Sequence, residues 1–175
     1  MTLLDRLFGF GSDPHAATRP LWHAAVVAAR DPHWYSDLGV ADTVPGRFDM
    51  VTIVLALVLL RLEDEPDSAA ESVRLTEMFV EDMDAQLRQS GVGDLMVGKH
   101  VGKLMATLGG RLGSLRDALP NPEEAPLREA VERNVTLEKP ELAGALARQL
   151  KTAAQRLAEQ PVEELRRGRL PQLAR

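Results

Sequence analysis

Cysteine is absent from this chain of 175 residues, and aromatic residues make up only 4% of it. The absence of cysteine excludes a disulfide framework, a thiolate metal site and a cysteine nucleophile together. Because aromatic residues are scarce, the core must consist mainly of Leu, Val, Ala and Met. Hydrophobic residues account for 45% and charged residues for 27% of the chain, which is the balance of an ordinary globular domain.

Long apolar runs are also scarce. The one extended run, Met50 to Leu60, has about half of the roughly 20 residues that a membrane-spanning helix needs. Near the N-terminus, Asp5 and Arg6 interrupt the apolar residues, which is not the pattern of a signal peptide. We therefore expect a protein that stays in the cytoplasm, has no membrane span and contacts the inner membrane only at its periphery.

The net charge is −5, which argues against direct binding of nucleic acid. Charge of each sign is nevertheless concentrated: the stretch from Glu63 to Asp84 is mainly acidic, and the stretch from Arg148 to Arg175 is mainly basic. Solvated helix faces are the simplest interpretation. A charge distribution of this kind can also orient a protein on a partner or on an anionic membrane.

Helical patterns cover most of the chain, and no strand pattern or internal repeat is present. We expect helices from Asp13-Pro14 to Asp31, over 47–62, 68–90 and 95–119, from Asn121 to about Val135, and from Pro140 to about Leu157, with a short turn over 161–168. Residues 47–62 are apolar on every side, so this helix belongs in the middle of the fold. The sequence predicts an all-α, single-domain bundle of about six or seven helices around it. Residues 1–12 form an amphipathic segment, 13–160 the helical domain and 161–175 a basic tail.

Two features inside the predicted helices stand out. Asp82 lies at the edge of an apolar stripe, near Leu75 and Met78, and needs a partner because an unpaired buried charge is costly. The small residues Gly98, Gly102, Ala106 and Gly110 recur every four positions. Such a row allows another backbone to approach closely, and we interpret it as packing within this chain.

Catalytic patterns are incomplete. The segment Gly93–Lys99 has the glycine spacing and the lysine of a phosphate-binding loop, but His100 follows where Ser or Thr is needed, and no buried strand precedes it. Glu81 and Asp84 point away from the helix face of Asp82, so the three carboxylates do not converge on a metal. We predict no catalytic residue, no metal and no cofactor, which leaves a binding or scaffolding protein.

Several motifs occur in a characteristic order. Before and at the start of the apolar helix stand Trp34-Tyr35 and Gly39-Val-Ala-Asp42-Thr43-Val-Pro-Gly46-Arg47-Phe48-Asp49; after it stand Phe79-Val-Glu-Asp82-Met-Asp84, Leu87-Arg88-Gln-Ser-Gly91-Val-Gly93-Asp94, Lys99 and Gly110-Arg111. Together they resemble the ubiquinol–cytochrome c chaperone family over most of residues 34–135. The chain departs from the family pattern at Ala56, often His in the family, and at Leu108, Gly109 and Leu115, often aromatic.

The resemblance implies a non-enzymatic assembly chaperone that binds newly made cytochrome b before it joins the ubiquinol–cytochrome c reductase. A second assembly factor and the ribosome are further partners of members of this family. The candidate client-binding or motif residues are Trp34, Tyr35, Asp42, Arg47, Asp49, Asp82, Asp84, Arg88, Asp94, Lys99 and Arg111. We expect seven of the charged ones to form a network around loops 39–46 and 91–98: Arg47, Asp49, Asp82, Arg88, Asp94, Lys99 and Arg111. This network either braces the loops or presents a charged rim to the client.

The apolar client requires an apolar surface. A groove lined with Leu and Met suits this task because Met adapts to varied partners. Met78, Met96 and Met105 are candidates for its lining, although packing in the core is the preferred interpretation of each. The segment 1–12 is either an interfacial membrane anchor or a segment that docks on the protein's own core.

Two other functions stay open. The apolar helix and the glycine row also suit a peripheral lipid- or quinone-binding module at the inner membrane, for which we expect a large enclosed apolar pocket. The segment Gly93–Lys99 leaves a nucleotide-using enzyme as the third alternative.

Overall fold

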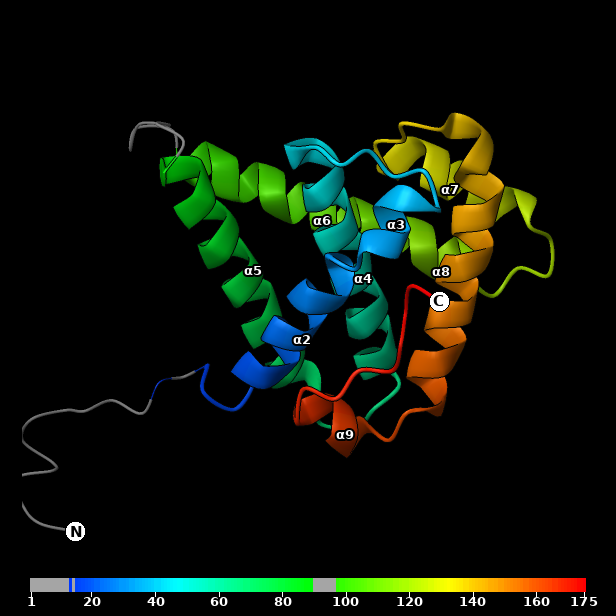
Figure 1. The fold of residues 1–175 in the computed structure, drawn as a ribbon. Coiled ribbons are helices and arrows are strands. Elements are labelled where there is room, and N and C mark those ends of the chain that lie inside the picture. Colours follow the sequence, from blue (N-terminus) through cyan, green and yellow to red (C-terminus); the bar gives the residue numbers. More distant parts are fainter. Residues whose placement is uncertain (1–12, 14, 90–96) are drawn as a thin grey trace, which may run out of the picture.

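The computed structural model describes residues 13, 15–89 and 97–175, and the side chains of these residues except 87–89 and 97–99 (Figure 1). The helices are α2 (Arg19–Ala29), α3 (Pro32–Ser36), α4 (Val44–Glu63), α5 (Ala69–Gln89), α6 (Val97–Ala118), α7 (Ala125–Asn134), α8 (Ala143–Glu159) and α9 (Val162–Arg166), with a 3-10 turn, η2 (Pro140–Leu142), before α8. Extended pairing within the described residues is limited to one isolated bridge, Val40 to Leu137. The predicted all-α, single-domain fold is confirmed.

Helix α4 lies in the middle of the molecule, with α5 and α8 on opposite sides of it (Figure 1). It contacts α2, α5, α6 and α8, and every residue from 49 to 59 is buried. The prediction of a central helix that is apolar all round is therefore confirmed. No described helix combines the length and the apolar composition that crossing a membrane requires.

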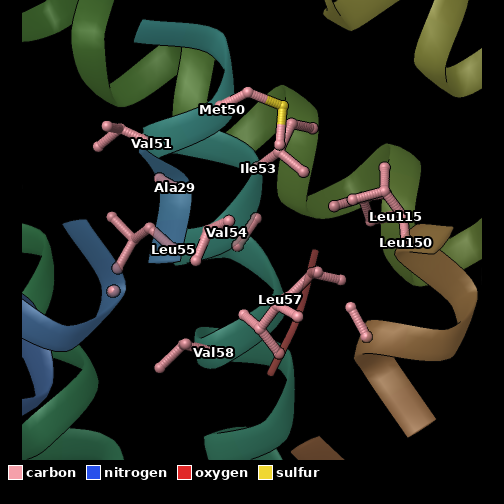
Figure 2. Packing of buried hydrophobic residues seen from close by; sticks show 14 of the residues in the cluster. Ala29, Met50, Val51, Ile53, Val54, Leu55, Leu57, Val58, Leu115 and Leu150 are labelled. Carbon is pink, nitrogen blue, oxygen red and sulfur yellow. The ribbon is translucent and has the colours of Figure 1, made fainter. Parts of the chain in front are cut away.

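The side chains of α4 leave the helix on more than one side (Figure 2). Val51 and Leu55 point to one side, toward Ala29 of α2. On another side, Leu115 of α6 and Leu150 of α8 reach the core, and both are almost fully buried. A helix that packs on several sides has no polar face, which explains its continuous apolar sequence.

Several helix starts differ from the predicted positions: α7 begins at Ala125 rather than at Asn121, and α8 begins at Ala143, after the 3-10 turn that begins at Pro140. Helix α4 begins at Val44 rather than at residue 47, because the Thr43 hydroxyl accepts a hydrogen bond from the Gly46 N–H (3.3 Å) and Pro45 fits the first turn. Helix α2 begins at Arg19 rather than at Asp13-Pro14. Pro20 lies in the first turn of α2, where a proline does not kink the helix because its missing N–H has no partner within the helix at this position.

The row of small residues on α6 does not pack within this chain, contrary to our prediction. Gly102, Ala106 and Gly110 are exposed, and a Cβ atom added at Gly102 or Gly110 would meet nothing within 4 Å. Gly98 lies outside the described side chains. The buried face of α6 instead carries Leu104 and Leu108, so the small residues point to the surface.

The chain after α8 folds back onto the bundle. Leu165 of α9 and Leu173 are buried, and the Gln149 side chain donates a hydrogen bond to the Leu173 carbonyl (2.6 Å). Arg166 pairs with Glu71 at the start of α5, with 3.0 Å between Nε and Oε2. Ion pairs within the chain thus neutralise part of the positive charge of this segment.

Gly46 sets the contact between the first turn of α4 and the preceding loop. A Cβ atom at this position would lie 2.0 Å from the Ala41 carbonyl oxygen, and Ala41 is itself held by a hydrogen bond from its N–H to the Thr136 carbonyl (2.9 Å). We expect Gly46→Ala to lower the free energy of unfolding by about 1–3 kcal/mol, because the backbone must shift. Urea denaturation followed by circular dichroism measures this loss.

Gly102→Ala is the matched control. It sits in the exposed, open part of α6, where alanine favours the helix by up to about 1 kcal/mol over glycine. The two Gly→Ala changes should therefore shift the stability in opposite directions. A Gly46→Ala protein as stable as the wild type would show that the loop around Ala41 yields without cost.

Candidate functional site

A surface groove of about 590 Å³ lies between α5 and α6, with the end of α4 at its base. Its apolar lining consists of Leu59, Val73, Val80, Val101, Met105 and Leu112. In the described part of the chain, four large hydrophobic side chains are clearly exposed: Val27, Val44, Val73 and Met105. Two of these four, Val73 (56% exposed) and Met105 (44% exposed), belong to the groove. Exposed apolar side chains from two helices, α5 and α6, therefore come together in this groove.

The three methionine candidates fall in different places. Met105 lines the groove, as the proposed lining requires. Met78 is buried in the core, and Met96 lies outside the described residues. Packing in the core, our preferred interpretation of all three, is therefore wrong for Met105.

Carboxylates accompany the apolar lining. Glu63, Glu77 and Glu81 line the groove, and no Lys or Arg stands among its described lining residues. Glu63 accepts a hydrogen bond from Arg116 (2.6 Å to Nη2), and the Glu81 carboxylate lies 3.5 Å from His15 Nε2. The groove is consequently apolar inside and acidic at its edge.

Asp49 and Arg111 form a buried ion pair between α4 and α6, with only 9% of each side chain exposed. Asp49 Oδ2 also accepts hydrogen bonds from the Thr136 N–H (2.8 Å) and hydroxyl (2.7 Å). The Arg111 guanidinium lies over the Phe48 ring, 5.3 Å from its centroid. These contacts join α4, α6 and the segment after α7, so this pair of motif residues braces the fold.

Arg47 and Asp42 form a second, exposed pair, with 2.6 Å between Nε and Oδ1. The hydrogen bond from Arg47 lowers the pKa of the Asp42 carboxyl. Both residues line a polar surface pocket of about 500 Å³ together with Tyr35 and Lys139. Burial raises the pKa of the Tyr35 hydroxyl, which donates a hydrogen bond to the Ala29 carbonyl (2.8 Å).

Trp34 and Asp82 both serve helix packing. Trp34 is fully buried, and its indole N–H donates to the Ala28 carbonyl (2.9 Å). Asp82 has the partner that we predicted, because the Trp22 indole N–H donates to its carboxylate (3.1 Å). Asp84 is half-buried and has a partner of its own.

The described members of the predicted network lie in three separate contacts: Arg47 with Asp42, Asp49 with Arg111, and Asp82 with Trp22. They do not join into one network. Arg88, Asp94 and Lys99 lie outside the described side chains, as does the segment Gly93–Lys99. Over the ranges with described side chains, no three His, Asp or Glu residues are grouped in a way that could hold a metal ion.

Sequence reasoning missed the acidic edge of the groove. Glu77 and Glu81 fall opposite the apolar stripe of α5, where solvated carboxylates are expected. The sequence feature that could have indicated the groove is Val73, an apolar residue on the otherwise polar side of α5. Ala56, Leu108 and Leu115, where the chain departs from the family pattern, are buried. These three departures therefore change the core rather than an exposed client surface.

Comparison with known proteins places the chain in a family. A sequence model described as ubiquinol-cytochrome C chaperone matches residues 36–173. The fold is similar to the crystal structure of the Cbp3 homolog from Brucella abortus, with a TM-score of 0.79 and 29% sequence identity over 96% of this chain and 95% of that chain. Comparison with curated proteins gave no match. The chain belongs to the ubiquinol–cytochrome c chaperone family.

Proposed function

We propose that this protein is a non-enzymatic chaperone that binds newly made cytochrome b on the cytoplasmic side of the inner membrane and promotes its assembly into the ubiquinol–cytochrome c reductase. Family membership supports the assembly role. The observation that carries the client-binding role is the apolar groove between α5 and α6, where Val73 and Met105 are exposed. An unassembled membrane protein presents apolar surface, and a groove of this kind covers it.

The groove suits a chain segment because it is open along one side. Its walls come from two separate helices, and α6 carries the exposed Gly102 and Gly109 beside Val101 and Met105. At 100° per residue, these glycines follow the groove-lining residues around the helix. A partner helix can therefore approach the α6 backbone closely, as small residues allow in helix pairs.

The lipid- or quinone-binding alternative is less well supported. We expected it to require a large enclosed apolar pocket, whereas Val73 and Met105 in the walls of this groove are about half exposed. A small apolar ligand would stay in contact with water along the open side.

Deletion of the gene tests the proposed function. We expect selective loss of spectrally detectable cytochrome b and of assembled reductase from membranes, with rescue by the wild-type chain, while an unrelated oxidase stays at its normal level. Normal reductase levels in the deletion strain would overturn the assembly role and move the lipid- or quinone-binding alternative to the front.

A further inference from the structure

We infer that the α5/α6 groove selects apolar segments that carry Lys or Arg at their ends, and thereby recognises the cytoplasmic end of a transmembrane helix. This inference rests on the proposed function and names the chemistry of the client segment. The observation behind it is the combination of an apolar lining with three carboxylates and no basic residue among the described residues of one groove.

The free negative charge is concentrated at two of these carboxylates. Glu63 is neutralised by Arg116. Glu77 is exposed and makes no ion pair with another described residue, and Glu81 keeps 67% of its side chain exposed beside His15. Arg74, a basic residue of α5, does not line the groove.

Three described basic residues near the C-terminus are already paired with carboxylates of this chain. Arg166 pairs with Glu71 and Glu163, and Arg167 and Arg169 both pair with Glu164. These ion pairs neutralise part of the positive charge near the C-terminus. Glu77 and Glu81 are left to face an incoming partner.

Membrane proteins supply the complementary pattern. Cytoplasmic loops carry an excess of Lys and Arg close to the ends of transmembrane helices. A client segment taken from this region joins apolar residues to a cationic flank, which matches the apolar lining and the acidic edge. Charge complementarity of this kind contributes to specificity and to the rate of association.

The test uses the full chain and two fluorescent peptides of about 20 residues, the length of a membrane span. They share one apolar helical sequence and carry either Lys or Glu at both ends. Anisotropy should show that the wild type binds the Lys-flanked peptide about tenfold more tightly, as two or more exposed ion pairs would give. The preference should fall in about 1 M NaCl, where the Debye length is about 3 Å.

The double variant Glu77→Lys/Glu81→Lys should reverse the preference, whereas Glu159→Lys on α8, outside the groove, should leave it unchanged. Equal affinity of the wild type for both peptides would overturn the inference, as would an unchanged preference in the double variant. Sedimentation identifies another occupant: if the double variant alters self-association but not peptide preference, the groove contacts a second copy and the inference fails. The gene-deletion phenotype is a separate readout, so a chain that the reductase requires but that shows no flank preference keeps the proposed function.

Discussion

Replacement of Asp49 by Ala should lower the free energy of unfolding by about 3–5 kcal/mol, because it leaves the buried Arg111 cation without its counter-charge. The loss extends beyond one ion pair. The N–H and hydroxyl of Thr136 also lose their acceptor, and Arg111 Nη1 is already buried with no hydrogen-bond partner among the described residues. A loss of this size is a large part of the roughly 5–15 kcal/mol that holds a typical domain together. Urea denaturation followed by circular dichroism measures it.

Arg47→Ala is the matched control, because it removes an exposed motif pair in which 61% of the Arg47 side chain and 57% of the Asp42 side chain are open to solvent. Pairs of this kind contribute at most about 1 kcal/mol. The double variant Asp49→Leu/Arg111→Met should recover only part of the stability, since it removes the unpaired buried charge but leaves the Thr136 N–H and hydroxyl without their acceptor. If Asp49→Ala were as stable as Arg47→Ala, the buried pair would not brace the fold.

The contrast between these two pairs explains what the sequence could predict. The motifs predicted that charged residues near the loops matter, and the apolar run from Met50 to Leu60 predicted the central helix. Neither pattern contains the sequence-distant contacts that decide burial. Asp49 meets Thr136, and Asp82 meets Trp22, and pairs this far apart in the chain follow from packing rather than from local spacing.

The groove was harder to predict for a related reason. Helical periodicity separates an apolar face from a polar face within one helix, but a groove is formed by the space between two helices. Val73 on α5 and Met105 on α6 belong to different predicted helices. The glycine row on α6 was assigned to internal packing because periodicity cannot distinguish a surface that meets its own chain from one that is left for a partner.

Replacement of both Val73 and Met105 by Asp should reduce assembled reductase to the level of the gene deletion, while the variant protein stays folded. Both side chains are about half exposed in the free protein, so the fold does not depend on their burial. A bound client would cover the exposed half of each, and covering two half-exposed side chains of this size contributes about 1.5–3 kcal/mol, which corresponds to about tenfold to a hundredfold in affinity. Membrane spectra measure cytochrome b, and circular dichroism verifies the fold.

Val27→Asp on α2 is the control, because Val27 is 71% exposed and does not line the groove. It introduces a negative charge at an apolar position that is even more accessible than those in the groove, so it should leave the reductase intact. The comparison separates a general effect of surface charge from loss of a specific apolar contact. If the double variant is folded and still supports normal reductase levels, the client must meet another surface, and the polar pocket around Tyr35, Asp42 and Arg47 is then the next place to substitute. If only the groove variant fails, the exposed apolar lining is the surface through which the chaperone holds its client.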